Sequence, residues 1–66
     1  MSMSYAAIVS LLVQRGLSRP EAEELADALQ WHDWKGDAHS QVASLYKIAE
    51  LFLFVGMQAV EDFLKA

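Results

Sequence analysis

The segment Ser18-Arg19-Pro20-Glu21 constrains the fold of this chain more than any other short stretch. A serine followed three residues later by a glutamate forms a capping box, in which each side chain bonds to a free backbone N–H of the other residue at the start of a helix. Pro20 fits the first helical turn, because the N–H that it lacks would have no partner there. A helix is therefore predicted to begin at residue 18, with its inner face marked by Ala22, Leu25, Leu29 and His32.

Similar signals predict helices on either side of this one. Ser4 is a suitable N-cap for a first helix, and Gly16 supplies the left-handed residue that ends it, with Leu17 folding back onto the last turn. Asp37 can cap a third helix, which either continues through Gly56 or breaks there, since a glycine inside a helix costs about 1 kcal/mol. We expect helices near residues 4–15, 18–34, 38–55 and 57–65.

The fold class that follows is all-α: a small bundle of three or four helices, in a single domain of residues 1–66, with no sheet. The chain has no cysteine, so no disulfide stabilises it. Yet 55% of its residues are apolar, and a domain of this size has little interior in which to bury them. This surplus predicts a homodimer or a stable complex with another protein.

The charge pattern argues against a nucleic-acid partner. Nine acidic residues outnumber five basic ones, for a formal net charge of −4. Nucleic-acid binding requires clustered basic residues, whereas here they are scattered singly, at Arg15, Arg19, Lys35, Lys47 and Lys65. The first two helices could still form a helix-turn-helix, so a small dimeric DNA-binding regulator is the alternative hypothesis.

Neither a membrane anchor nor a targeting signal is predicted. The uncharged apolar run near the C-terminus begins at Leu51 and stops at Gln58, which is far short of the ~20 residues of a spanning helix. The apolar run near the N-terminus follows no basic residue and precedes no convincing cleavage site. We therefore expect a cytoplasmic protein without a membrane partner.

No residue pattern indicates catalysis. The sequence has no nucleophile motif and no glycine-rich phosphate loop, and so small a chain has little room for a substrate pocket. His32, Asp33, Asp37 and His39 could be imagined as metal ligands, but they lie across a predicted helix end without the spacing that such sites use. We expect no enzyme activity, no small-molecule substrate, no metal and no cofactor.

The predicted third helix carries its core residues on one face. At ~100° per residue, Phe52 falls within about 20° of Leu45 on the helical wheel. We therefore expect Phe52 to lie in the core, together with Leu45, Ile48 and Phe63.

Phe54 stands on the opposite face of this helix, at about 180° on the same wheel. It lies among charged residues there, flanked by Leu51 and Met57, which is typical of a helix that docks against another protein. Trp31 and Trp34 project from the acidic side of the second helix. They either contribute to the interface, as tryptophan often does, or cover the end of that helix.

The C-terminal third, ASLYKIAELFLFVGMQAVEDFLKA, resembles one tetratricopeptide unit. Its first helix matches at Leu45, Ile48, Ala49 and Phe52, its turn at Gly56, and its second helix at Ala59, Phe63 and Ala66. The turn after the glycine is shorter than in that family. The chain is also similar to the small tetratricopeptide-like co-chaperones of bacterial type III secretion, which hold an aggregation-prone needle subunit by its amphipathic helix.

These observations predict a non-enzymatic protein–protein interaction module: a small adaptor, co-chaperone or inhibitor that docks an amphipathic helix of its partner. The resemblance narrows this to a type III secretion needle co-chaperone. The residues expected to bind the partner, or a second copy of the chain, are Phe54, Leu51, Met57, Trp31 and Trp34.

Overall fold

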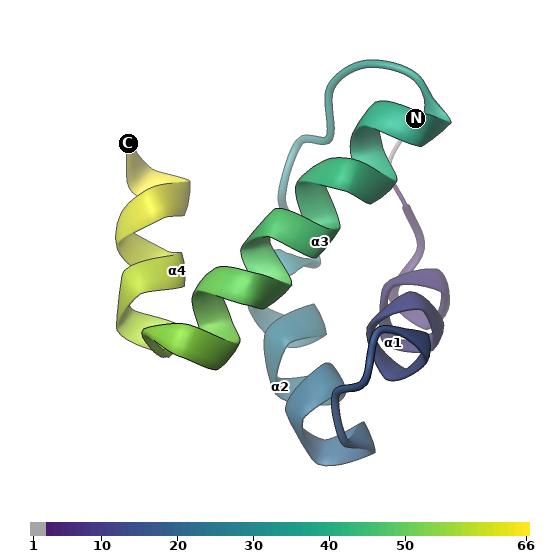
Figure 1. The fold of residues 1–66 in the computed structure, drawn as a ribbon. Helices are drawn as coiled ribbons and strands as arrows, with labels where there is room; N and C mark the ends of the chain where they lie inside the picture. Colours follow the sequence, from purple (N-terminus) through teal and green to yellow (C-terminus); the bar gives the residue numbers. More distant parts are fainter. Residues whose placement is uncertain (1–2) are drawn as a thin grey trace.

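The computed structural model describes residues 3–66, and in this part of the chain it contains helices and no strand (Figure 1). The all-α prediction is therefore confirmed. The four helices are α1 (Tyr5–Gln14), α2 (Arg19–Leu29), α3 (Ala38–Phe54) and α4 (Met57–Lys65).

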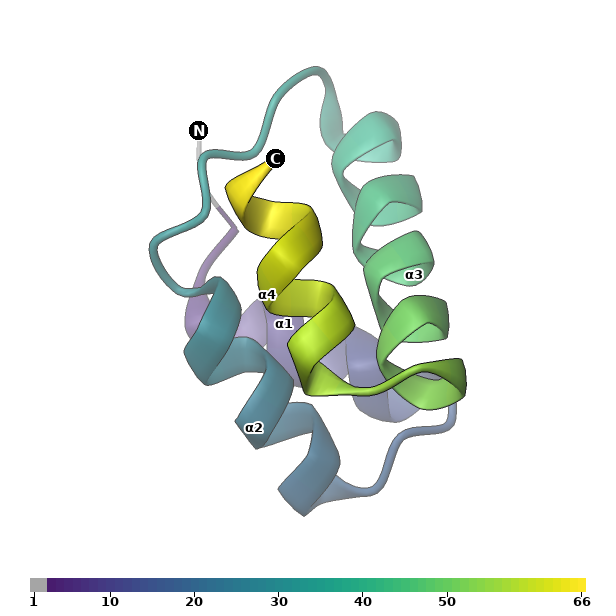
Figure 2. The same ribbon diagram turned by 90° about the vertical axis from the view of Figure 1, so that its left-hand side faces the viewer.

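The helices are arranged with α2 and α3 in the middle of the molecule. One side of this pair is covered by α1 and the other by α4, as the two views at right angles show (Figures 1 and 2). The shorter connections join α1 to α2 and α3 to α4, so the molecule consists of two successive helical hairpins. The core lies between the faces of the two hairpins that pack against each other.

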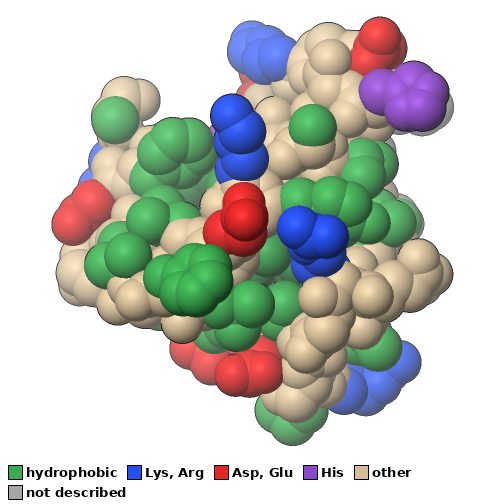
Figure 3. All heavy atoms as spheres, in the orientation of Figure 1, with side chains coloured by type: hydrophobic (Ala, Val, Ile, Leu, Met, Phe, Trp, Pro, Cys, Tyr) green, Lys and Arg blue, Asp and Glu red, His purple; other side chains and the backbone are tan. Residues whose placement is uncertain are grey.

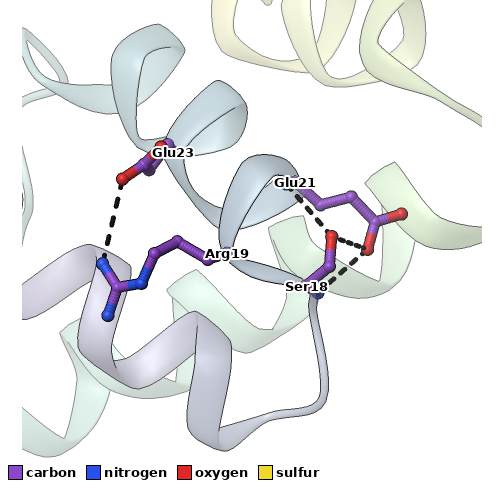
Figure 4. Close-up of polar contacts among 4 residues, drawn as sticks. All are labelled: Ser18, Arg19, Glu21 and Glu23. Carbon is purple, nitrogen blue, oxygen red and sulfur yellow. Dashed lines mark hydrogen bonds and ion pairs between the residues drawn. The ribbon is translucent and has the colours of Figure 1, made fainter.

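The start of α2 has the predicted capping box (Figure 4). The backbone N–H of Glu21 donates to the Ser18 hydroxyl oxygen at 3.3 Å, and the backbone N–H of Ser18 donates to the Glu21 carboxylate at 3.0 Å. The Ser18 hydroxyl also donates to that carboxylate, at 2.9 Å. Arg19 in the same turn pairs with Glu23 at 3.8 Å. The Ser18 and Glu21 side chains thus bond two backbone N–H groups that have no partner within the helix.

The end of α1 is closed by the turn that Gly16 was predicted to form. Gly16 has a φ of 111°, and its N–H donates to the carbonyl of Val13 while the N–H of Leu17 donates to the carbonyl of Leu12. This pair of bonds is a Schellman motif. Leu17 is buried with Leu12 in the core, so the turn also supplies the expected hydrophobic contact.

The second helix is shorter than predicted, because α2 ends at Leu29 and not near residue 34. The chain then runs as turn and irregular backbone to Asp37. Two contacts stabilise this course: Trp34 turns back into the core with only 5% of its surface exposed, and the Gln41 side-chain amide donates to the Gly36 carbonyl at 3.0 Å. A helix continued to residue 34 would forfeit both contacts.

The third helix breaks at Gly56, which settles the alternative left open by the sequence. Gly56 has φ 121° and ψ 176°, a conformation that is essentially confined to glycine. Its N–H donates to the carbonyl of Leu51 at 3.2 Å. At the other end of α3, the backbone N–H of Ser40 donates to the Asp37 carboxylate at 2.8 Å, as predicted for an N-cap.

The core is drawn mainly from the first hairpin and from the inner face of α3. Its buried apolar residues are Ile8, Val9, Leu12, Leu17, Ala22, Leu25, Ala26, Leu29, Trp34, Leu45, Ile48, Ala49 and Val60. The sequence placed Leu45 and Ile48 correctly. Phe52 packs only at the edge of this cluster, half-buried.

The prediction that Phe63 lies in the core is wrong. Its side chain is 57% exposed, and Val60 is the buried residue of α4. The prediction for Phe63 assumed one continuous helix through Gly56, whereas α3 and α4 are separate helices. The break changes the direction of the chain, so it also changes which face of the last helix points inward.

The exposed surface area of the chain is close to that expected for a folded protein of its size. The chain exposes 4350 Å², and the general scaling for a folded protein of 7.4 kDa gives about 4200 Å². The bundle is therefore packed about as well as its size allows. The exposed apolar side chains are therefore confined to particular positions on the surface and do not result from a loosely packed core.

Candidate protein-binding surface

Three consecutive exposed apolar side chains lie where α3 passes into α4. Phe54 is 84% exposed, with Val55 at 68% and Leu53 at 49% beside it in the chain. Leu51 and Met57 are half-buried and pack against the edge of the core. We call these five residues the α3–α4 corner.

The corner is exposed because the last residues of α3 lie beyond the fully buried part of the helix. The deeply buried residues of α3 stop at Ala49. Beyond this point both flanks of the helix reach the surface, so Leu53 and Val55 are exposed as well as Phe54. These two residues were not predicted, because the helical wheel assigns them to the sides of the helix and contains no information about where the core ends.

The space-filling view shows the same surface in its surroundings (Figure 3). Hydrophobic side chains gather over α4 and the adjoining end of α3, and acidic and basic side chains border them. An apolar centre with a charged margin is the arrangement found in many protein–protein interfaces.

The two tryptophans, both predicted to be candidates for binding, occupy opposite environments. Trp31 is 87% exposed just beyond the end of α2, whereas Trp34 is 5% exposed in the core. The ring of Trp34 meets the ring of His32 edge-on, with 4.6 Å between the centroids. Trp34 therefore covers the end of α2 and is removed from the set of surface residues, while Trp31 stays in it.

Two hollows lie beside the C-terminal half of α4, with Leu64 on the wall of both. One, of about 360 Å³, separates α4 from Ser44, Lys47 and Ile48 of α3. The other, of about 460 Å³, is lined by Ala28 of α2 and the loop that follows it, including Trp31. The exposed ring of Phe63 borders the first hollow.

Most of the basic side chains already have partners within the chain. The Arg15 guanidinium lies over the ring of Tyr46, 4.9 Å from its centroid. Arg19 pairs with Glu23, and Lys35 pairs with Asp33 at 2.9 Å. These contacts engage three of the five basic side chains, so fewer of them are available to bind a phosphate backbone.

The shifted pKa values have structural causes. The Ser18 amide and hydroxyl hold the pKa of Glu21 below its usual value, and the Ser40 amide does the same for Asp37. The bond from Lys35 lowers the pKa of Asp33. Partial burial, followed by the nearby Asp27 carboxylate, raises the pKa of Tyr5. Caps and surface pairs account for the three carboxylates, and none of them requires a catalytic role.

Residues 3–66 contain no group of three or more His, Asp or Glu side chains close enough to hold a metal ion. His32 is half-buried and His39 is exposed. In the same part of the chain, no helix combines the length and the apolar character needed to cross a membrane. No protein-family model, no curated protein and no solved structure matches the chain.

Proposed function

We propose that this protein is a non-enzymatic protein–protein interaction module that binds an amphipathic helix of its partner at the α3–α4 corner. The observation that carries the proposal is the exposure of Phe54, at 84%, between two further exposed apolar residues. In a chain whose other large apolar residues are mostly buried or half-buried, such a concentration favours a binding surface over incidental exposure.

The physical basis is the burial of apolar area on a firm support. Each Å² of apolar surface removed from water contributes roughly 25 cal/mol. Aromatic side chains at the centre of an interface commonly dominate its binding energy. Because Phe54 lies in the last turn of a 17-residue helix, its backbone is held before the partner arrives, which reduces the entropy lost on binding.

The resemblance to tetratricopeptide units makes the proposal more specific. Co-chaperones of type III secretion hold the amphipathic helix of a needle subunit, and an apolar corner of this kind suits such a ligand. We therefore propose this class of partner, and with it a bacterial protein that acts in the cytoplasm. A second copy of the chain is the competing partner, since the same corner could pair with itself in a homodimer.

The charges make the alternative DNA-binding function less favourable. Gln41, one of the few side chains of α3 suited to reading bases, is buried and bonded to the Gly36 carbonyl. Residues exposed near the start of α2 include Glu23 and Glu24, and acids there would repel phosphates.

Affinity capture from the native cell, at low and at high salt, tests the proposal. An apolar contact should hold the captured protein at both salt concentrations, whereas phosphate contacts weaken steeply with added salt. Hydrogen exchange on the captured complex should then show protection at a helix of the partner and at residues 51–57. Capture of nucleic acid that is lost with salt would contradict the proposal.

A further inference from the structure

The helix α4 is held to the rest of the molecule by a narrow apolar contact. Val60 is its fully buried residue, and Met57 and Leu64 are half-buried beside it. Within residues 3–66, no ion pair and no side-chain hydrogen bond joins α4 to another helix. The bond from Gln58 to Asp62, at 3.1 Å, stays inside α4. Nothing polar therefore fixes the position of α4.

The site in which α4 packs leaves two hollows, open to solvent, beside this helix. We call it the α4 groove and define its walls by Ala28, Trp31 and His32 on the side of α2, and by Ser44, Lys47 and Ile48 on the side of α3. The hollows of about 360 and 460 Å³ lie on either side of Leu64. At this position α4 leaves space that a larger side chain could fill.

The connection to α3 allows α4 to leave this groove. Gly56 begins α4 without a side-chain cap and with a backbone conformation confined to glycine. A short turn that contains this residue connects the two helices. A change at Gly56 alone could swing α4 outward without disturbing the first hairpin.

We propose that the α4 groove is a second helix-binding site, and that α4 is its internal occupant, which a partner helix displaces. The partner carries apolar residues at the spacing of Met57, Val60 and Leu64, that is i, i+3 and i+7, with a bulkier side chain at the third position. This inference rests on the proposed function in taking the partner to be a helix. It adds the site to which that helix binds and the spacing of its apolar residues. The α4 of a second copy fits less well, because it would leave the same hollows empty.

The test uses the full chain and a fluorescein-labelled peptide with the sequence of residues 56–66. Wild type should bind this peptide weakly, because the attached α4 competes at a high effective concentration. The Val60→Asp chain releases its own α4, so it should bind the peptide at least about tenfold more tightly. A peptide with Leu64→Trp should bind more tightly still, and a peptide with Val60→Asp should not bind. Equal binding by the two chains, or no gain from the tryptophan, overturns the proposal.

A second pair of variants decides the matter if Val60→Asp fails to fold. Gly56→Ala strains the α3–α4 turn and leaves the groove unchanged, so it should bind the peptide several-fold more tightly than wild type. Gly16→Ala introduces similar strain in the other hairpin and should give no such gain. The proposal is overturned if the two alanine variants bind alike, or if Gly56→Ala forms a dimer that excludes the peptide, since the occupant would then be a second copy.

Failure of the α4 groove proposal can be distinguished from failure of the binding function proposed for the α3–α4 corner. Phe54 does not line the groove, so Phe54→Glu combined with Val60→Asp should bind the peptide as Val60→Asp does alone. Absence of peptide binding overturns the groove and leaves the corner untouched. Partner capture that is unaffected by Phe54→Glu overturns the corner and leaves the groove untouched.

Discussion

The two helical hairpins of this protein turn in a similar way but use their apolar residues differently. Each first helix ends at a glycine with positive φ, 111° at Gly16 and 121° at Gly56, where an added Cβ would meet no atom within 4 Å. After Gly16 the next residue, Leu17, is buried, and a capping box starts the following helix. Before Gly56 the chain exposes Phe54 and Val55, and α4 has no side-chain cap.

This difference separates folding from binding within one small chain. Both helices of the first hairpin place several residues in the core, among them Leu12 and Leu25, whereas α4 contributes Val60. A hairpin that buries most of its apolar surface contributes to stability, and a hairpin that leaves such surface exposed is suited to a partner. We therefore expect substitutions in the first hairpin and on the inner face of α3 to unfold the domain, and substitutions in α4 and at the α3–α4 corner to change its contacts.

The largest effect should come from emptying the core of the first hairpin. Leu25 is fully buried, and Leu→Ala substitutions at such positions cost about 2–5 kcal/mol, so Leu25→Ala should leave much of so small a domain unfolded. Val60→Ala removes two buried carbons at about 0.8 kcal/mol each and should leave α1–α3 folded. Circular dichroism during urea unfolding measures both. Equal losses would show that α4 is as integral to the fold as α2.

The two glycines provide a matched comparison of intermediate size. Alanine at a left-handed position costs roughly 1–2 kcal/mol, so Gly16→Ala should lower the free energy of unfolding of the whole domain by that amount. Gly56→Ala should instead speed amide hydrogen exchange mainly in α4, because that helix opens locally. Exchange measured residue by residue by NMR distinguishes the two patterns. Uniform acceleration in Gly56→Ala would contradict the division into two hairpins.

Acid should weaken the first hairpin by a smaller amount. The depressed pKa of Glu21 means that the folded state prefers the ionised carboxylate. Its contribution is therefore present above the ordinary value of 4.5 and is lost as the pH falls through the lower folded value. Glu21→Gln should be less stable than wild type near neutral pH and should approach it in acid. A difference that stays constant with pH would show that the capping box does not depend on this charge.

Much of the fold could be predicted because its signals are local. A capping box, a glycine at a helix end or an aspartate N-cap acts within four residues, so Ser18, Gly16 and Asp37 gave correct helix starts and ends. The end of α2 was wrong because it depends on tertiary packing. Trp34 gains more from the core than from a continued helix, and no pattern within the helix records this.

The candidate surface could be predicted only in part, for the same reason. The wheel correctly separated Phe54 from Leu45 and Ile48, since all three lie within one unbroken helix. It failed for Phe63, because the break at Gly56 changed the direction of the helix. Whether Trp31 or Trp34 faces outward depends on the path of the loop between α2 and α3, which only the folded chain defines.

The most direct test of the central claim is partner capture by wild type and by Phe54→Glu. Because Phe54 is 84% exposed, the charge should leave the helical signal and the unfolding curve nearly unchanged, as surface substitutions usually do. It should abolish capture of the partner, since an ionised carboxylate cannot be buried in an apolar contact without a large cost. Ser10→Glu, an exposed position on α1, adds the same charge as a control and should capture normally. Normal capture by Phe54→Glu would contradict the account.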